Sequence, residues 1–133
     1  MRRRAAALLL AGLALAAPVA RACGTCAEDK VAATYDHALL QKAAKQGRVM
    51  VFCEVAGPWD AARLRAAARR TQGVDPDSLR FSRELSAMSF ALDTKRQSAQ
   101  GAALAIQRAA PDGTRVRIVQ VMGTPAPKAG HRH

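Results

Sequence analysis

The chain has 133 residues, of which 50% are hydrophobic and only 4% aromatic, and its formal net charge at pH 7 is +11. This length is enough for one compact domain and, once an export signal is removed, too short for two. The basic charge suits anionic surfaces and is also an ordinary aid to solubility. The few aromatic residues are not interleaved with basic ones, so we expect no nucleic-acid partner.

The first 22 residues have the pattern of a secretory signal peptide. Arg2 to Arg4 precede an apolar run over 5–17, and Ala20-Arg21-Ala22 fits a small-x-small cleavage site. The run is shorter than the roughly 20 residues that span a bilayer, so we expect no membrane span. Cleavage would make Cys23 the first residue of a periplasmic or secreted protein of 111 residues with a formal net charge of +7.

A cysteine directly after the cleavage point is also the residue that is acylated in bacterial lipoproteins. Arg21 departs from the Leu-Ala-Gly-Cys pattern of that signal, so a lipid anchor at Cys23 is the minor alternative. Acylation would consume one of the thiols discussed next.

The segment from Cys23 to Cys26 concentrates the reactive side chains of the chain, and a helix is expected to begin at its second cysteine. Thr25-Cys26-Ala27-Glu28 fits a capping box, and apolar residues then recur at helical spacing up to about residue 46. The unpaired amides and the positive dipole at a helix start favour a thiolate, which both metal binding and disulfide exchange require.

Two thiols at this spacing are compatible with three kinds of chemistry. A soft ion of the copper(I) type can be held by two thiolates, Cys23 and Cys26, or by three if Cys53 joins them, whereas zinc prefers four ligands. The second possibility is a structural disulfide among the three cysteines, in a non-catalytic structural or interaction protein. The sequence leaves the pairing of the cysteines open. The third is thiol-disulfide redox activity. In thioredoxin-like enzymes a strand precedes the Cys-x-x-Cys motif, and no strand is expected before Cys23 here.

The sequence contains no catalytic triad, paired-carboxylate site or phosphate-binding glycine loop, so we expect no enzyme. The expected partners are therefore a metal ion or another exported protein. His37 lies about three helical turns beyond Cys26, and His131 and His133 form only a weak pair in the tail. Trp59 is expected to be a packing anchor that opens a helix.

From residue 48 onward the pattern alternates between strands and helices. Val49, Val51, Cys53 and Val55 share one face of the first strand and Met50 and Phe52 the other, which indicates a central strand covered on both sides. Ser98 is a good N-cap for the second helix. The expected elements are a strand over 48–55, a helix over 59–71, strands over 78–83 and 87–92, a helix over 99–109 and a strand over 115–122.

This order predicts an α+β fold, a ferredoxin-like βαββαβ sandwich with an additional N-terminal helix. Because a ferredoxin-like sheet carries its two helices on one face, the additional helix is expected to pack across the other face or along its edge, which would bring Cys23 and Cys26 to a rim of the sheet. The predicted organisation is a signal peptide (1–22), a Cys-x-x-Cys segment with the N-terminal helix (23–47), a ferredoxin-like domain (48–122) and a flexible tail (123–133).

Three patterns in the second half of the chain suggest a family. Gly73-Val74 precedes a strand, a hairpin leads to Phe90-Ala91-Leu92-Asp93, and Ser98 begins a helix that contains Leu104-Ala105-Ile106. In these features the span 49–122 resembles a heavy-metal-associated domain, the ferredoxin-like module of copper chaperones, metal-pumping ATPases and periplasmic mercury-binding proteins. The loop that carries Cys-x-x-Cys in that family has no cysteine here and reads Ala56-Gly57-Pro58-Trp59-Asp60-Ala61-Ala62. The resemblance therefore implies the fold but no metal site at this loop.

A second register of the same resemblance begins earlier in the chain. Cys23-x-x-Cys26, a helix and then Gly47-Arg48-Val49 imitate the opening of the family, without its first strand. In this register the resemblance implies that Cys23 and Cys26 are the metal ligands.

Overall fold

The computed structural model describes residues 27–124, which form an α+β unit built on one four-stranded antiparallel sheet. Four α-helices are present in this part of the chain: α1 (Ala27–Thr34), α2 (His37–Lys45), α3 (Ala61–Arg69) and α4 (Ala99–Ala109). The strands are β1 (Val49–Ala56), β2 (Arg80–Ser82), β3 (Ala87–Leu92) and β4 (Arg115–Met122), and a 3-10 helix, η2, spans Pro76–Ser78. This architecture is compatible with the expected ferredoxin-like arrangement.

The strand order is β2-β3-β1-β4, which places β1 inside the sheet and β4 at one edge. Val51 of β1 lies opposite Phe90 of β3 on one side and opposite Val121 of β4 on the other. The register between β1 and β4 shifts between Phe52 and Cys53, which leaves Val119 as an extra residue in β4. Such a bulge increases the local twist of the edge strand.

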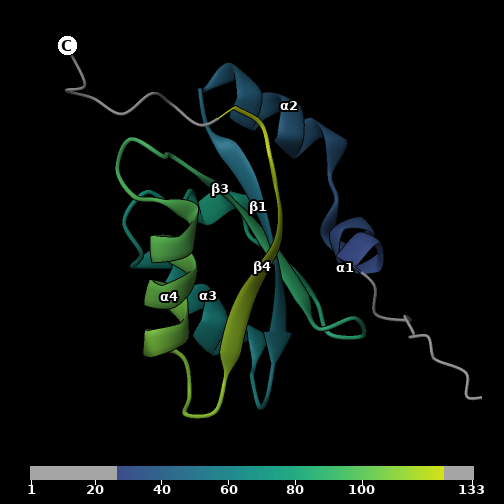
Figure 1. Cartoon of the computed structure of the whole chain (residues 1–133), viewed down its shortest axis with the longest axis vertical. Helices are drawn as coiled ribbons and strands as arrows, with labels where there is room; N and C mark the ends of the chain where they lie inside the picture. The colour runs from purple at the N-terminus through teal and green to yellow at the C-terminus, as the bar shows by residue number, and fades with distance from the viewer. Residues whose placement is uncertain (1–26, 125–133) are drawn as a thin grey trace, which may run out of the picture.

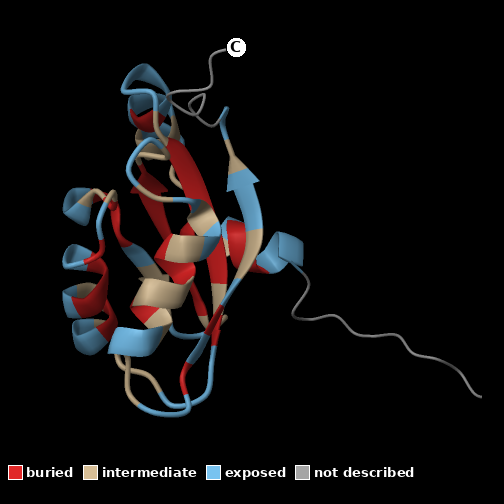
Figure 2. Ribbon diagram, turned by 60° about the vertical axis from the view of Figure 1, so that its left-hand side comes forward, coloured by how far each residue is buried: buried red, intermediate tan, exposed pale blue. Residues whose placement is uncertain are grey.

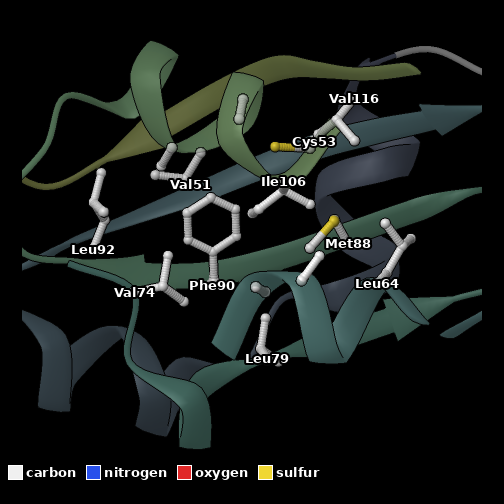
Figure 3. Close-up of a cluster of buried hydrophobic side chains, with 14 of the residues drawn as sticks. Val51, Cys53, Leu64, Val74, Leu79, Met88, Phe90, Leu92, Ile106 and Val116 are labelled. Atoms are coloured by element: carbon white, nitrogen blue, oxygen red, sulfur yellow. The ribbon is translucent and has the colours of Figure 1, made fainter. Parts of the chain in front are cut away.

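Helices α3 and α4 pack on one face of the sheet and enclose the larger core (Figure 1). The Asp60 side chain accepts hydrogen bonds from the first turn of α3, and the Ser98 hydroxyl accepts one from the Gly101 amide of α4 at 2.9 Å. These caps orient both helices so that their alanine and leucine stripes face the strands. Figure 3 shows the resulting cluster, in which Phe90 lies at the centre of packed aliphatic side chains.

The opposite face of the sheet is covered by α1 and α2 rather than by one helix over 26–46, so that expectation was wrong in detail. The chain leaves helical geometry at Tyr35-Asp36, where Asp36 is extended and its carboxylate accepts a hydrogen bond from the Leu39 amide at 3.1 Å. An N-cap at this position starts a new helix with its own direction. Both short helices contact the sheet through a smaller cluster: Val31, Ala43, Met50, Phe52 and Ala91.

Other elements lie close to their expected ranges. The ranges of β3, α4 and β4 coincide with expectation, whereas β2 is shorter because η2 occupies the residues before it. α3 begins at Ala61, after its cap Asp60, so Trp59 precedes the helix instead of opening it. Of the helices within residues 27–124, none has the length and apolar character needed to cross a bilayer. The expected signal peptide, Cys23, Cys26 and nearly all of the expected tail lie outside the described residues.

Candidate functional site

The Cys-x-x-Cys segment ends where the described structure begins. Cys26 immediately precedes Ala27, the first residue of α1, in the sequence. The first turn of α1 carries two exposed carboxylates, Glu28 and Asp29. Negative charge at this helix start attracts a cation.

A charged link holds α1 against the sheet. Lys30 is only 5% exposed, and its Nζ donates a hydrogen bond to the Leu85 carbonyl at 2.6 Å and lies 3.5 Å from Glu54 Oε2. On its other side Glu54 accepts hydrogen bonds from Arg117 Nε at 3.1 Å and from Arg117 Nη2 at 2.5 Å. The bonds from Arg117, aided by the positive charge of Lys30, hold the pKa of Glu54 below its usual value. The link thus joins α1, β1, β4 and the β2–β3 hairpin.

Cys53 lies on the other side of the sheet. Its side chain is 0% exposed and is packed with Ile106 and Val116 in the cluster beneath α3 and α4 (Figure 3). Burial raises the pKa of this thiol to about 12, and it forms no disulfide with another described residue. At neutral pH Cys53 is therefore a protonated core residue and not a thiolate.

Cys53 and helix α1, which follows Cys26 in the sequence, lie on opposite faces of the sheet. The helix that follows Cys26 packs against Met50 and Phe52, whereas Cys53 points to the opposite face of the same strand. The Cys53 thiol could reach a partner on the α1 face only if the packing of the larger cluster around it were disrupted. This placement argues against Cys53 as a third ligand or as a disulfide partner, and it leaves Cys23 and Cys26 to each other.

The loop between β1 and α3 is closed by packing. The Trp59 ring stacks on Phe81 with centroids 6.3 Å apart, and the guanidinium of Arg83 lies 5.2 Å from the Trp59 centroid. Gly57 has a φ of +86°, and a Cβ at this position would lie 2.2 Å from the Gly113 carbonyl oxygen. Trp59 also packs against the larger core, which confirms its expected role as an anchor.

The histidines add no further ligand set in the part of the chain that the structure describes. His37 is exposed at the start of α2, with Nδ1 3.3 Å from the Tyr35 hydroxyl. Within residues 27–124 no group of three or more histidine, cysteine, aspartate or glutamate side chains is placed to hold a metal ion. His131 and His133 lie outside these residues.

The contact between Lys30 and Glu54 was not predicted from the sequence. A signal was present, because Glu54 is the only charged residue in the strand VMVFCEVA. A carboxylate in such an apolar run calls for a cationic partner or for solvent. The identity of that partner depends on how α1 lies on the sheet, which local patterns do not reveal.

Comparisons of this chain with protein-family models, with curated proteins and with solved structures found no match. The resemblance to heavy-metal-associated domains therefore stays a prediction from the residues quoted above.

Proposed function

We propose that this chain is an exported, non-enzymatic, ferredoxin-like domain of heavy-metal-associated type that binds a soft metal ion of the copper(I) type through Cys23 and Cys26. The observation that carries the proposal is the position of Cys53, which is buried on the face of β1 away from α1. With Cys53 removed from the set, two thiols remain, and both lie shortly before α1 in the sequence. Two thiolates are a complete ligand set for copper(I) in linear coordination, whereas zinc would need two more ligands.

The surroundings of α1 support this assignment. The helix is fixed to the sheet by Lys30, Glu54 and Val31, so the residue that follows Cys26 has a defined position. Glu28 and Asp29 add negative charge that attracts a cation, but carboxylate oxygens are poor ligands for a soft ion and leave the coordination to sulfur. A site at the edge of the fold would let a second exported protein approach and exchange the ion.

The proposal is tested by titrating the anaerobically reduced protein with copper(I) in competition with a chromophoric chelator. We expect one ion per chain for the unaltered protein, and a loss of competitive binding in Cys23→Ser and in Cys26→Ser. Cys53→Ala is the matched control, because it removes a thiol that lies in the core, and its copper stoichiometry should be unchanged. Equal copper retention by the Cys23→Ser/Cys26→Ser double variant would overturn the proposal.

A structural disulfide between Cys23 and Cys26 is the second candidate, and the same observation favours it. A buried Cys53 accounts for the odd number of cysteines, because the remaining two can then pair with each other. Mass spectrometry of the exported protein distinguishes the candidates: a quantitative intramolecular disulfide that resists mild reduction, together with no copper uptake, would establish the disulfide instead. The same spectrum would reveal a lipid on Cys23.

Thiol-disulfide redox activity is the remaining alternative. Insulin reduction measures it directly, and we expect no activity from the unaltered protein. Activity that is lost in Cys26→Ser would establish a redox role in place of metal binding.

A further inference from the structure

Strand β4 is a long edge strand with one free side. It has eight residues and, among the described strands, pairs only with β1, whereas the opposite edge strand β2 has only three residues. Figure 1 shows β4 running along the outside of the sheet, with α4 on one side of it and α1 and α2 on the other. Unpaired backbone groups on such an edge can bind another strand.

The outward-facing backbone groups of β4 can be assigned from its neighbours. Val55 of β1 donates its N–H to the Ser86 carbonyl at 2.8 Å, on the β3 side. The backbone N–H and C=O groups of successive residues in a strand point to opposite sides, so those of every second residue of β1 point toward β3. The residue of β4 opposite each of these points its own N–H and C=O groups away from β1, toward the free edge. These β4 residues are Val116, Ile118 and Val121.

The two halves of this edge differ in how they are protected. In the first half the outward N–H of Val116 already donates to Gln107 Oε1 at 2.8 Å, and the charged Arg115 and Arg117 flank it. From Ile118 to Met122 the sequence IVQVM carries no charge, and Val121 is 38% exposed. Gln120 and Val121 are exposed and the other residues of this half are half-buried, and Figure 2 shows the upper part of β4 in these two colours. Charged side chains usually guard edge strands against pairing, and this half lacks them.

Hollows lie beside β4 on both faces of the sheet. One, of about 670 Å³, is lined by Leu104 and Gln107 of α4 and by residues 115–118 of β4. The other, of about 460 Å³, lies between α1 and β4 and is lined by Glu28, Tyr35 and Met122. The side chains of an added strand alternate between the two faces, so each set would have space to enter.

We propose that the free edge of β4 binds β4 of a second copy of this chain, which joins the two sheets into one antiparallel sheet of eight strands. Pairing Ile118 with Val121 of the second copy brings together two residues whose outward groups are free and whose side chains share the α4 face. The Val116 N–H, already bonded to Gln107, lies outside these pairs. The inference stands on described residues alone and does not depend on the proposed metal site.

The charges of the two halves favour a second copy as the occupant. In this register Arg117 lies opposite Met122 of the other copy, so the basic half of one β4 approaches the hollow that Glu28 lines. Neither Glu28 nor Arg115 forms an ion pair with another described residue. Because an antiparallel pair of identical strands has two-fold symmetry, this approach of a basic half to the hollow beside Glu28 occurs twice in the dimer.

Sedimentation equilibrium of the purified, fully reduced protein tests the proposal, since the reductant excludes intermolecular disulfides. We expect reversible dimers with a dissociation constant between about 1 μM and about 1 mM, the range of small, weak interfaces. Val121→Lys should weaken dimerisation by roughly tenfold or more, because it places a charge on the unguarded half of the edge. Ala66→Lys is the matched control, with the same charge on the exposed side of α3, and should dimerise normally.

A second variant separates dimerisation from folding. Val121→Pro removes an N–H that β1 does not use, so it should abolish dimers and leave the circular dichroism spectrum of the monomer unchanged. In the unaltered protein the Ile118 and Val121 amides should become protected from hydrogen exchange as concentration rises. A mass of one chain at concentrations up to about 1 mM, or equal dimerisation of Val121→Lys and Ala66→Lys, would overturn the proposal.

Discussion

The two faces of the sheet are held by different means. On the α3 and α4 face, sixteen described residues form one buried apolar cluster, whereas the corresponding cluster beneath α1 and α2 has only five. The smaller layer adds directional links: the Lys30 to Glu54 ion pair, and a hydrogen bond from the Ser89 hydroxyl to the Thr34 carbonyl at 3.4 Å. Because apolar burial supplies most of the stabilising free energy, we expect the N-terminal layer to open at a lower free energy than the main core.

Because of this difference, the layer that contributes most to stability is not the layer next to the proposed metal ligands. The Cys-x-x-Cys segment leads directly into α1, the more weakly held layer, while the thiol of Cys53 contributes to the strongly held one. Substitutions or a change of pH can therefore disturb one layer and leave the other intact, with the expected effects below running from the largest to the smallest.

Phe90→Ala should give the largest loss. The side chain is fully buried at the centre of the larger cluster, so its removal should lower the free energy of unfolding by about 3–5 kcal/mol in urea denaturation. Phe52→Ala, on the other face, is the matched variant and should cost less, with the amides of α1 and α2 losing hydrogen-exchange protection first. A larger loss of unfolding free energy for Phe52→Ala than for Phe90→Ala would contradict the inference that the α3 and α4 face is the more stable one.

Glu54→Ala should be next. It leaves the ammonium of Lys30, 5% exposed, with only the Leu85 carbonyl as its partner, and we expect a loss of about 1–3 kcal/mol. Lys30→Met keeps most of the buried stem and removes the charge, so it should cost less than Glu54→Ala. No loss of unfolding free energy in either variant would show that the ion pair does not hold α1.

Acid should weaken the N-terminal layer by a smaller amount. The pKa of Glu54 is lowered, first by the hydrogen bonds from Arg117, and that of Asp36 is lowered first by the Leu39 amide. Their stabilising contributions are therefore fully present above the ordinary carboxyl pKa values and are lost as the pH falls through the lowered folded values. Urea unfolding between about pH 7 and pH 3 should show this loss, and Glu54→Gln should flatten the pH dependence. An unchanged slope in Glu54→Gln would contradict the assignment.

The helix caps allow a comparison of the two layers through small changes in stability. Asp36→Ala and Asp60→Ala each remove a carboxylate that accepts backbone N–H bonds, and each should cost about 1 kcal/mol. The location of the effect should differ: Asp36→Ala should expose the amides of α2 alone, whereas Asp60→Ala should reduce the stability of the main core. Native-state hydrogen exchange reads both outcomes, and loss of α3 protection in Asp36→Ala would count against independent layers.

Elements marked by local signals could be predicted from the sequence. The ranges of β3, α4 and β4 follow from alternating apolar residues and from the Ser98 cap, which act over a few residues. The break at Asp36 was missed because apolar residues continue at helical spacing on both sides of it. Alternation also grouped Cys53 with the valines of β1, but only tertiary packing decides which face of the sheet α1 covers, and α1 lies on the face away from Cys53.

The central claim is that Cys23 and Cys26 alone hold a soft metal ion while Cys53 stays in the core. X-ray absorption spectroscopy of the copper(I)-loaded protein tests it most directly, because it counts the sulfur ligands around the ion. We predict two sulfur ligands per copper in the unaltered protein and the same spectrum in Cys53→Ala. A third sulfur that disappears in Cys53→Ala would contradict the account.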